Sequence, residues 1–355
     1  MSLAYALEKE VAVSAVIRAC QLTSSIFNKL VKDERLTKGD KSPVTVGDFS
    51  AQAVVNTILS RAFPGDKIVG EEDASELRDE ANATLRGRVV ELANQALASD
   101  LVPGDNAQWG IGPNSRRSAD ELLDAIDRGN FEGGSKGRMW TLDPIDGTKG
   151  FLRGEQYAVC LALLVDSSIE VGVIGCPNLP LDPQKPDGQK GCLFIAVRGQ
   201  GTEQRSLTNS QPTPIRIPSF RDEDINFLES VESGHSSHGF NERVAQIMKI
   251  SRQPTRMDSQ AKYCALARGD GGVYLRMPVG SGYREKIWDH AAGSLIVEEA
   301  GGVVTDSRGL PLNFGLGRDL GENHGVVGAG KTVQSKVIAA IQQAKEEEAK
   351  RNGSN

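Results

Sequence analysis

The sequence lacks a long hydrophobic run, a CxxC pair and an excess of basic residues. Its longest apolar stretch, residues 158–165, is far shorter than the roughly 20 residues that span a bilayer. The first ten residues include Glu8, Lys9 and Glu10, so they do not form the apolar core of a secretory signal. We therefore expect neither a membrane protein nor a secreted one.

Charge and cysteine content limit the partners and the compartment. Lys and Arg number 41 and Asp and Glu number 47, whereas a protein that binds a nucleic-acid polymer normally carries a basic excess. A net charge of −6 still permits a small anionic substrate, because bound cations reverse the local field. The five cysteines are odd in number and form no CxxC motif, which indicates reduced thiols in the cytoplasm or nucleus.

The length of 355 residues predicts about two domains of roughly 150 residues each. Hydrophobic residues make up 39% of the chain and charged residues 25%, which is a globular composition. The stretch from Ser206 to Ser219, rich in Pro, Ser and Thr, is the best candidate for a boundary. We predict an α+β domain over residues 1–212 and an α/β domain over residues 213–355.

Local patterns distinguish the two parts. In the first part, we predict helices at 13–31, 51–62, 75–98 and 122–126, and a loop around Ser42-Pro43. We predict strands at 68–70, 140–142, 157–165, 169–176 and 192–197. A hairpin turn is expected at 166–168 and an excursion from the sheet at 179–191. In the second, strands at 225–228, 273–276, 303–306 and 325–327 alternate with helices at 242–250, 260–267, 290–300 and 333–348. That alternation is typical of an α/β domain.

The densest chemical signal is the motif Asp143-Pro144-Ile145-Asp146-Gly147-Thr148. Its two carboxylates, three residues apart, follow the strand at 140–142 in a turn that Pro144 and Gly147 shape. Carboxylates together with a backbone carbonyl, here that of Ile145, are hard oxygen ligands that suit Mg²⁺. For such a motif alone, an Asp-rich turn in water is the ordinary alternative.

Other acidic positions add to this signal. Glu71 and Glu72 follow the strand at 68–70, and Asp289 begins the helix at 290–300. Taken alone, Asp289 would stabilise a helix N-terminus by about 0.3–1 kcal/mol, and Glu71 and Glu72 would lie in a solvated loop. Their combination with residues 143–148 favours a metal site.

Three motifs together resemble the signature of the magnesium-dependent, lithium-sensitive phosphatases. They are Gly70-Glu71-Glu72, the 143–148 motif and Trp288-Asp289-His290-Ala291-Ala292-Gly293. That superfamily includes inositol monophosphatases, inositol polyphosphate 1-phosphatases, fructose bisphosphatases and 3′(2′),5′-bisphosphate nucleotidases. The resemblance implies a layered αβαβα sugar-phosphatase-like fold, with the metal site between an α+β half and an α/β half.

Within the superfamily, the chain is most similar to the 3′(2′),5′-bisphosphate nucleotidases, the salt-tolerance phosphatases of sulfur assimilation. The similarity rests on residues 42–48, 231–238, 258–263 and 285–289. The 72 positions that separate Glu71 from Asp143 are also more than we expect in an inositol monophosphatase. Residues 179–191 and the tail after Ala349 match no part of the family pattern.

The resemblance implies a role for each candidate residue. Two or three Mg²⁺ ions would be held by Glu71, Asp143, Asp146, Asp289 and the carbonyl oxygen of Ile145. Asp48 and Thr148 would orient and deprotonate the attacking water. The substrate nucleotide would be bound by Thr148, His238, Ser259, Lys262, Arg276 and Asp289. The resemblance further implies inhibition by Li⁺ and Ca²⁺.

The residues themselves leave alternatives open. Lys262 could lie on a solvated helix face, Arg276 could be a structural ion-pair partner, and His238 could be a surface residue near a helix start. A phosphate near the start of the helix at 260–267 is physically reasonable, because helix N-termini attract anions.

The implied activity is Mg²⁺-dependent hydrolysis of the 3′-phosphate of adenosine 3′,5′-bisphosphate (PAP) to AMP and phosphate. The sulfated analogue PAPS, which would yield APS, is a second expected substrate. An inositol polyphosphate 1-phosphatase is the nearest alternative. We expect a monomeric enzyme that acts on a small molecule, binds no nucleic-acid polymer or membrane, and lies in the cytoplasm, with the nucleus as a further compartment.

Residues 325–332 match the Walker A pattern GxxxxGK[ST], so a P-loop ATPase or kinase is the alternative from another class. That motif needs a strand before its first glycine and a helix after it. Here the preceding segment is polar and Gly-rich, and the apolar residues fall inside the loop itself. We therefore predict a last strand, a turn and a C-terminal helix. A catalytically silent nucleotide sensor would need a missing ligand, and none is missing.

Overall fold

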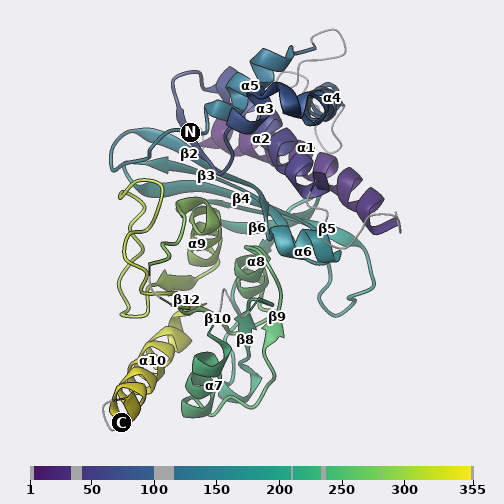
Figure 1. The fold of residues 1–355 in the computed structure, drawn as a ribbon. Coiled ribbons are helices and arrows are strands. Elements are labelled where there is room, and N and C mark those ends of the chain that lie inside the picture. Colours follow the sequence, from purple (N-terminus) through teal and green to yellow (C-terminus); the bar gives the residue numbers. More distant parts are fainter. Residues whose placement is uncertain are drawn as a thin grey trace.

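Two β-sheets form the framework of the protein (Figure 1). The computed structural model describes residues 4–32, 42–99, 116–208, 211–232, 237–280 and 282–352. Within these residues, the larger sheet has seven strands in chain order: β1 (Lys67–Gly70), β2 (Arg138–Asp146), β3 (Ala158–Val165), β4 (Ser168–Pro180), β5 (Lys190–Val197), β6 (Gly201–Ser206) and β7 (Thr213–Ile215). The smaller has five described strands in the order β11 (Gly302–Thr305), β12 (Val326–Gly330), β10 (Val273–Arg276), β8 (Phe227–Glu229) and β9 (Thr255–Arg256).

Helices cover both sheets. In the first part of the chain they are α1 (Ala6–Lys32), α2 (Ser42–Ala62), α3 (Ser75–Arg78), α4 (Ala83–Ala98), α5 (Ala119–Asp127) and α6 (Thr148–Arg153). In the second they are α7 (His238–Ile247), α8 (Ala261–Arg268), α9 (Ala291–Glu299) and α10 (Lys331–Asn352). Short 3₁₀ helices are η1 (Glu80–Asn82), η2 (Asp222–Asp224) and η4 (Ile287–Asp289).

Successive side chains of a strand point to opposite faces of the sheet, so the hydrophobic core is divided into three layers. On β3, Leu161 packs in the core shared with α1 and α2, whereas Cys160 packs in the core shared with α8 and α9. On β10, Tyr274 joins that same middle core, and Val273 packs on the other side with α7 and α10. The order is helix, sheet, helix, sheet, helix (Figure 1), and the layered αβαβα fold is confirmed.

The register of the larger sheet brings two acidic stretches together. β1 pairs with β2 in parallel, and the later neighbours pair antiparallel. Gly70, the last residue of β1, lies opposite Leu142 of β2. Glu71 and Asp143, which come next in each chain segment, therefore lie side by side at the same edge of the sheet.

The predicted strands and most of the predicted helices are confirmed. Most ends shift by a few residues, but the first two helices begin at Ala6 and Ser42 rather than at residues 13 and 51. The hairpin turn between β3 and β4 has positive φ at both Asp166 (47°) and Ser167 (69°), as a tight two-residue hairpin requires. The predicted excursion at 179–191 is the connection from β4 to β5, closed by a hydrogen bond from Leu181 N–H to the Gln189 carbonyl at 2.9 Å.

Two local predictions in the first part are wrong. α2 begins at Ser42, so residues 42 and 43 are helical rather than a loop. Proline is compatible with the first turn of a helix, because N–H groups there have no intrahelical acceptor. The helix predicted at 75–98 is interrupted at Asp79, whose extended backbone and side-chain hydrogen bond to Ala81 N–H compete with the helix.

The residues that match the Walker A pattern do not form a phosphate-binding loop. Gly328 and Gly330 lie within β12, opposite Tyr274 of β10 and Gly302 of β11. α10 begins at Lys331, directly after the strand, so the prediction of a turn between them is wrong. A P-loop needs a loop between its strand and its helix, so the P-loop ATPase or kinase alternative is wrong.

Two further predictions concern organisation. We predicted a domain boundary at residue 212. β7 pairs with β6 and so extends the larger sheet just beyond that residue. The boundary stays a prediction. Across the described chain, the helices are too short or too polar to cross a bilayer.

Candidate active site

A cavity of about 360 Å³ lies where β1 and β2 end and residues of both parts of the chain meet. The first part contributes the predicted residues Glu71, Asp143, Ile145, Asp146 and Thr148. The second part contributes Ser259, Lys262, Arg276 and Asp289. The structure therefore brings together every predicted metal ligand and most of the predicted nucleotide-binding residues.

β2 does not end at Leu142 but continues to Asp146, so the 143–148 motif is not a simple turn. Its pairing with β3 is regular as far as Asp143 and resumes at Asp146 after a shift in register. An irregularity of this kind redirects side chains and backbone. It allows Asp143, Ile145 and Asp146 all to reach the cavity.

Gly147 turns the chain from β2 into α6. Its φ of 91° is a left-handed conformation that favours glycine, and a Cβ here would lie 3.0 Å from the Cβ of Ser259. Thr148 follows as the exposed first residue of α6. Ser259, with a φ of 68°, is buried on the opposite side and accepts a hydrogen bond from Ala261 N–H at 3.1 Å.

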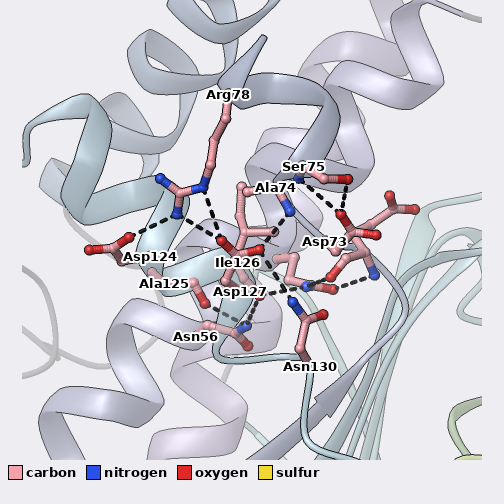
Figure 2. A network of polar contacts seen from close by, with 12 residues as sticks. Asn56, Asp73, Ala74, Ser75, Arg78, Asp124, Ala125, Ile126, Asp127 and Asn130 are labelled. Carbon is pink, nitrogen blue, oxygen red and sulfur yellow. Dashed lines mark hydrogen bonds and ion pairs between the residues drawn. The ribbon is translucent and has the colours of Figure 1, made fainter.

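The segment that follows β1 is fixed by polar contacts with α2 and α5 (Figure 2). Asp127, the last residue of α5, accepts a hydrogen bond from Ala74 N–H at 2.8 Å and pairs with Arg78 at 2.7 Å. Gln52 of α2 donates to the carbonyl of Glu72 at 2.5 Å and accepts from its N–H at 3.1 Å. These contacts hold the acidic pair at residues 71 and 72 beside the cavity.

Asp48 lies on α2 and is not among the described residues that line the cavity. A Cβ at the neighbouring Gly47 would lie 2.7 Å from Cδ1 of Ile145, so glycine lets α2 approach the metal motif closely. Asp48 is buried, and its Oδ1 has no hydrogen-bond partner in the described part of the chain. Burial raises the pKa of Asp48, and the carboxylates of Glu72 and Glu71 raise it further.

Gln260 connects the two sides of the cavity. Its backbone N–H donates to Asp146 Oδ2 at 2.5 Å, and its side chain donates to the Trp288 carbonyl at 2.7 Å. The same side chain accepts from Gly293 N–H at 3.0 Å. Gln260 therefore fixes Asp146 relative to Asp289, which lies between Trp288 and α9. Sequence reasoning placed Gln260 in a matching block but gave it no role.

The pKa of each carboxylate among the predicted metal ligands is raised above its ordinary value. Burial raises the pKa of Asp143 well above its usual value, and Glu71, Asp146 and Asp289 raise it further. Burial and the charge of Asp146 also raise the pKa of Asp289, and they raise that of Glu71 although its hydrogen bond with Asp143 opposes the change. Among the described residues, the buried Oδ1 of Asp143 has no hydrogen-bond partner. Carboxylates crowded in this way need compensating positive charge, so the oxygen donors fit a hard cation such as Mg²⁺.

Lys262 is a buried cation at the same cavity. The side chain is only 2% exposed, so the alternative of a solvated helix face is wrong. Nζ donates to the Met257 carbonyl at 3.0 Å and lies 5.8 Å from the ring centre of Tyr274. Burial lowers the pKa of Lys262 to about 8, although the charge of Asp146 opposes the change. Most Lys262 side chains are therefore charged at neutral pH.

Arg276 is both an ion-pair partner and a cavity residue. Its Nε and Nη2 donate to Glu285 at 2.9 and 2.7 Å, as the structural alternative predicts. A hydrogen bond of 3.1 Å also joins Glu285 to His290 Nε2. Burial favours the neutral form of Glu285, but His290 and Arg276 outweigh it and hold the pKa at about 2.

Glu285, Asp289 and His290 also have potential ligand atoms within 4.8 Å of one another. Glu285 and His290 are bonded to each other, and Glu285 is further occupied by Arg276. Asp289, in contrast, lines the cavity with the other predicted ligands. The group therefore adds no second metal site to the one predicted.

His238 is not brought into this cavity. It begins α7 and lines a neighbouring cavity of about 400 Å³, with Glu229 and Arg256. Its Nε2 lies 3.0 Å from the carbonyl oxygen of Ser230, a residue that does line the first cavity. His238 thus lies one residue behind the cavity wall, and its role in nucleotide binding stays a prediction.

Sequence reasoning gave no role to several lining residues: Lys149, Glu232, Asp258, Tyr274 and Tyr283. Lys149 directly follows the metal motif, which is the signal that could have found it. It pairs with Glu232 at 3.1 Å across the cavity edge. Tyr283 carries no local pattern that points to the cavity.

Fold and site together define a layered phosphatase with an acidic cavity whose oxygen donors fit a cation. The chain matches the inositol monophosphatase family over residues 6–346, and it belongs to that family.

Curated relatives of the chain carry names that are more specific than that of the family. The chain is 50% identical over 342 residues to a Schizosaccharomyces pombe protein named 3′(2′),5′-bisphosphate nucleotidase, with 94% of each chain covered. It is 41% identical over 353 residues to the Arabidopsis thaliana 3′,5′-bisphosphate nucleotidase 2, with 96% of this chain and 98% of that one covered.

Solved structures agree on the fold. CysQ from Bacteroides thetaiotaomicron, a bacterial member of the inositol monophosphatase family, superposes with a TM-score of 0.59 at 20% identity, over 93% of this chain and 99% of that one. The Thermotoga maritima IMPase gives a TM-score of 0.58 at 18% identity, over 95% and 98%. At these identities the likeness supports the fold alone.

Proposed function

We propose that this protein is a Mg²⁺-dependent phosphomonoesterase that removes the 3′-phosphate of PAP, giving AMP and phosphate. PAPS is a second substrate, which yields APS. One observation carries the proposal: the carboxylates and the buried cation Lys262 share a single cavity. In a bisphosphate, one phosphate can bind to the metal ions held by the carboxylates, and the other can bind to Lys262. The names of the relatives at 41–50% identity support the nucleotide over other phosphate esters.

The oxygen donors of Glu71, Asp143, Asp146, Asp289 and Ile145 would hold two or three Mg²⁺ ions. Bound Mg²⁺ supplies a Lewis acid that lowers the pKa of water and neutralises the charge that develops on the phosphate. The four carboxylates hold that charge in place before reaction, so little reorganisation is needed at the transition state.

The chain's own residues then position and deprotonate the attacking water. Asp48 is the base: its buried Oδ1 has no partner among the described residues, and its raised pKa makes it a stronger proton acceptor. Thr148, at the exposed start of α6, orients the same water. Lys262 and Arg276 bind parts of the nucleotide remote from the 3′-phosphate, with Ser259 and His238, and so hold the ester in line for attack.

Lys262→Ala tests the substrate assignment. Loss of a charge-assisted hydrogen bond to phosphate should cost about 1.5–3 kcal/mol, mainly as a higher KM for PAP. A small phosphomonoester without the second phosphate does not use this contact. The ratio of kcat/KM for PAP to that for the small ester should therefore fall. Lys185→Ala, in the exposed β4–β5 connection, is the control. Equal losses on both substrates would remove Lys262 from the nucleotide site.

Inhibition by Li⁺ and Ca²⁺ belongs to the same proposal. Li⁺ should inhibit at concentrations at which K⁺ does not, because it can occupy a site made for Mg²⁺. Ca²⁺ should inhibit because it prefers a larger and looser coordination shell than Mg²⁺. Rates of PAP hydrolysis are compared in LiCl and KCl at matched ionic strength, and with CaCl₂ added. Identical rates in LiCl and KCl would argue against lithium sensitivity.

A further inference from the structure

Arg318 lies in the long connection between β11 and β12, and its side chain reaches the end of β1. Its Nη2 donates to the carbonyl of Gly70 at 2.5 Å. Its Nη1 donates to the carbonyls of Gly129 and Phe131, each at 3.0 Å. The guanidinium carbon also lies 4.9 Å from the ring centre of Trp288, within the range of a cation–π contact.

These contacts join two segments that carry predicted metal ligands and come from different parts of the chain. Gly70 immediately precedes Glu71, and Trp288 immediately precedes Asp289. Glu71 follows β1 of the larger sheet, whereas Asp289 ends η4, which precedes α9. A single side chain therefore touches the residue before a ligand on each side of the cavity.

The backbone around Arg318 is itself fixed to the Asp289 side. Ile287 N–H donates to the Arg318 carbonyl at 3.2 Å, and Leu320 N–H donates to the Glu285 carbonyl at 2.8 Å. The connection also approaches the other side very closely: a Cβ at Gly133 would lie 2.6 Å from the carbonyl oxygen of Gly317. Arg318 therefore extends from an anchored backbone and bridges a narrow gap.

The chemistry of the contact indicates positioning rather than charge pairing. The three side-chain hydrogen bonds of Arg318 described above all go to backbone carbonyls, and burial lowers the pKa of Arg318 despite the charges of Glu132 and Asp73. A planar fork can bond several carbonyls and stack on a ring at once, which a lysine ammonium cannot do. Mg²⁺ accepts only near-ideal octahedral geometry, so its site is sensitive to the spacing of ligands on separate elements.

We propose that Arg318 is a positioning residue that sets the spacing between Glu71 and Asp289 and so tunes the affinity of the site for Mg²⁺. The inference rests on the proposed metal site. It concerns a residue outside every motif that pointed to that site.

The test uses Arg318→Lys, which keeps the charge, and Arg318→Met, which keeps an unbranched apolar stem over Trp288. Mg²⁺ alone is titrated into each protein, and the melting temperature and the Trp fluorescence are followed without substrate. PAP hydrolysis is titrated with Mg²⁺ in parallel. We expect the half-saturating Mg²⁺ concentration to rise on the order of 10- to 100-fold in both kinds of titration, the range for residues that orient metal ligands. Turnover at saturating Mg²⁺ should recover most of the wild-type value.

Arg308→Lys is the matched control, because Arg308 lies in the same connection and pairs with Asp306 at 2.7 Å, away from the cavity. It should titrate like the wild type. A lower melting temperature in EDTA with an unchanged Mg²⁺ midpoint in Arg318→Lys would overturn the inference, because Arg318 would then only stabilise the fold. If Arg318→Met does not fold, Arg318→Lys decides alone. A wild-type protein that shows no response to Mg²⁺ would instead overturn the proposed metal site.

Discussion

Asp143→Asn is expected to lower Mg²⁺-dependent turnover by at least about 10²- to 10³-fold, the loss typical of removing one preorganised electrostatic group from a transition state. Asp143 is the most crowded of the cavity carboxylates, because Glu71, Asp146 and Asp289 all raise its pKa. Asparagine has nearly the same volume but no negative charge, so the fold should persist while metal binding fails. Steady-state kinetics over a wide range of Mg²⁺ concentration provide the measurement.

The same variant should change stability in the opposite direction. Without metal, the pKa of Asp143 in the folded protein is raised above its unfolded value. At any pH above its unfolded pKa this carboxyl therefore destabilises the folded state, and the cost decreases as the pH falls through the raised pKa towards the unfolded value. Asp143→Asn removes the cost at every pH. Its melting temperature in EDTA should match or exceed that of the wild type, and the increase caused by Mg²⁺ should shrink.

Asp187→Asn, in the exposed connection between β4 and β5, is the control for both measurements and should behave as the wild type. Full activity of Asp143→Asn at ordinary Mg²⁺ concentration, with an undiminished thermal response to Mg²⁺, would contradict the assignment of Asp143 as a ligand.

Asp48→Asn is expected to lower kcat by about 10²- to 10⁴-fold on every substrate, the usual contribution of a general base. Asp48 is buried, and its raised pKa suits a proton acceptor. Because Asp48 is proposed as a base and not as a ligand, KM for PAP and the half-saturating Mg²⁺ concentration should change little.

This combination separates a base from a ligand. If Asp48→Asn kept a normal kcat at high Mg²⁺ and only required more of the ion, Asp48 would be a metal ligand. If it affected PAP and a small phosphomonoester to very different extents, Asp48 would belong to the nucleotide site.

Local sequence patterns predicted most elements because apolar periodicity reports which face of a strand or helix is buried. They could not predict where β2 ends, because the shift in register between Asp143 and Asp146 depends on pairing with β3. They also missed the break at Asp79, where a side-chain hydrogen bond replaces a backbone one.

The motifs found the cavity carboxylates because spacing along a strand end is a local property. The contacts that hold these carboxylates in place are long-range. Gln52 and Gln260 each bond backbone groups of other elements, and Arg318 bonds Gly70, which is 248 positions away in the chain. No local pattern encodes such contacts. For the same reason, the placement of His238 behind the cavity wall was not predictable from its position near a helix start.

Phosphate release from PAP, inositol 1,4-bisphosphate and ATP, each measured with and without Mg²⁺, tests the proposed reaction directly. We expect rapid release from PAP only when Mg²⁺ is present, with a much lower kcat/KM for inositol 1,4-bisphosphate and no release from ATP. Efficient release from inositol 1,4-bisphosphate with little from PAP would contradict the nucleotide assignment and favour the inositol polyphosphate 1-phosphatase alternative. Release from PAP at the same rate without Mg²⁺ would contradict the metal site itself.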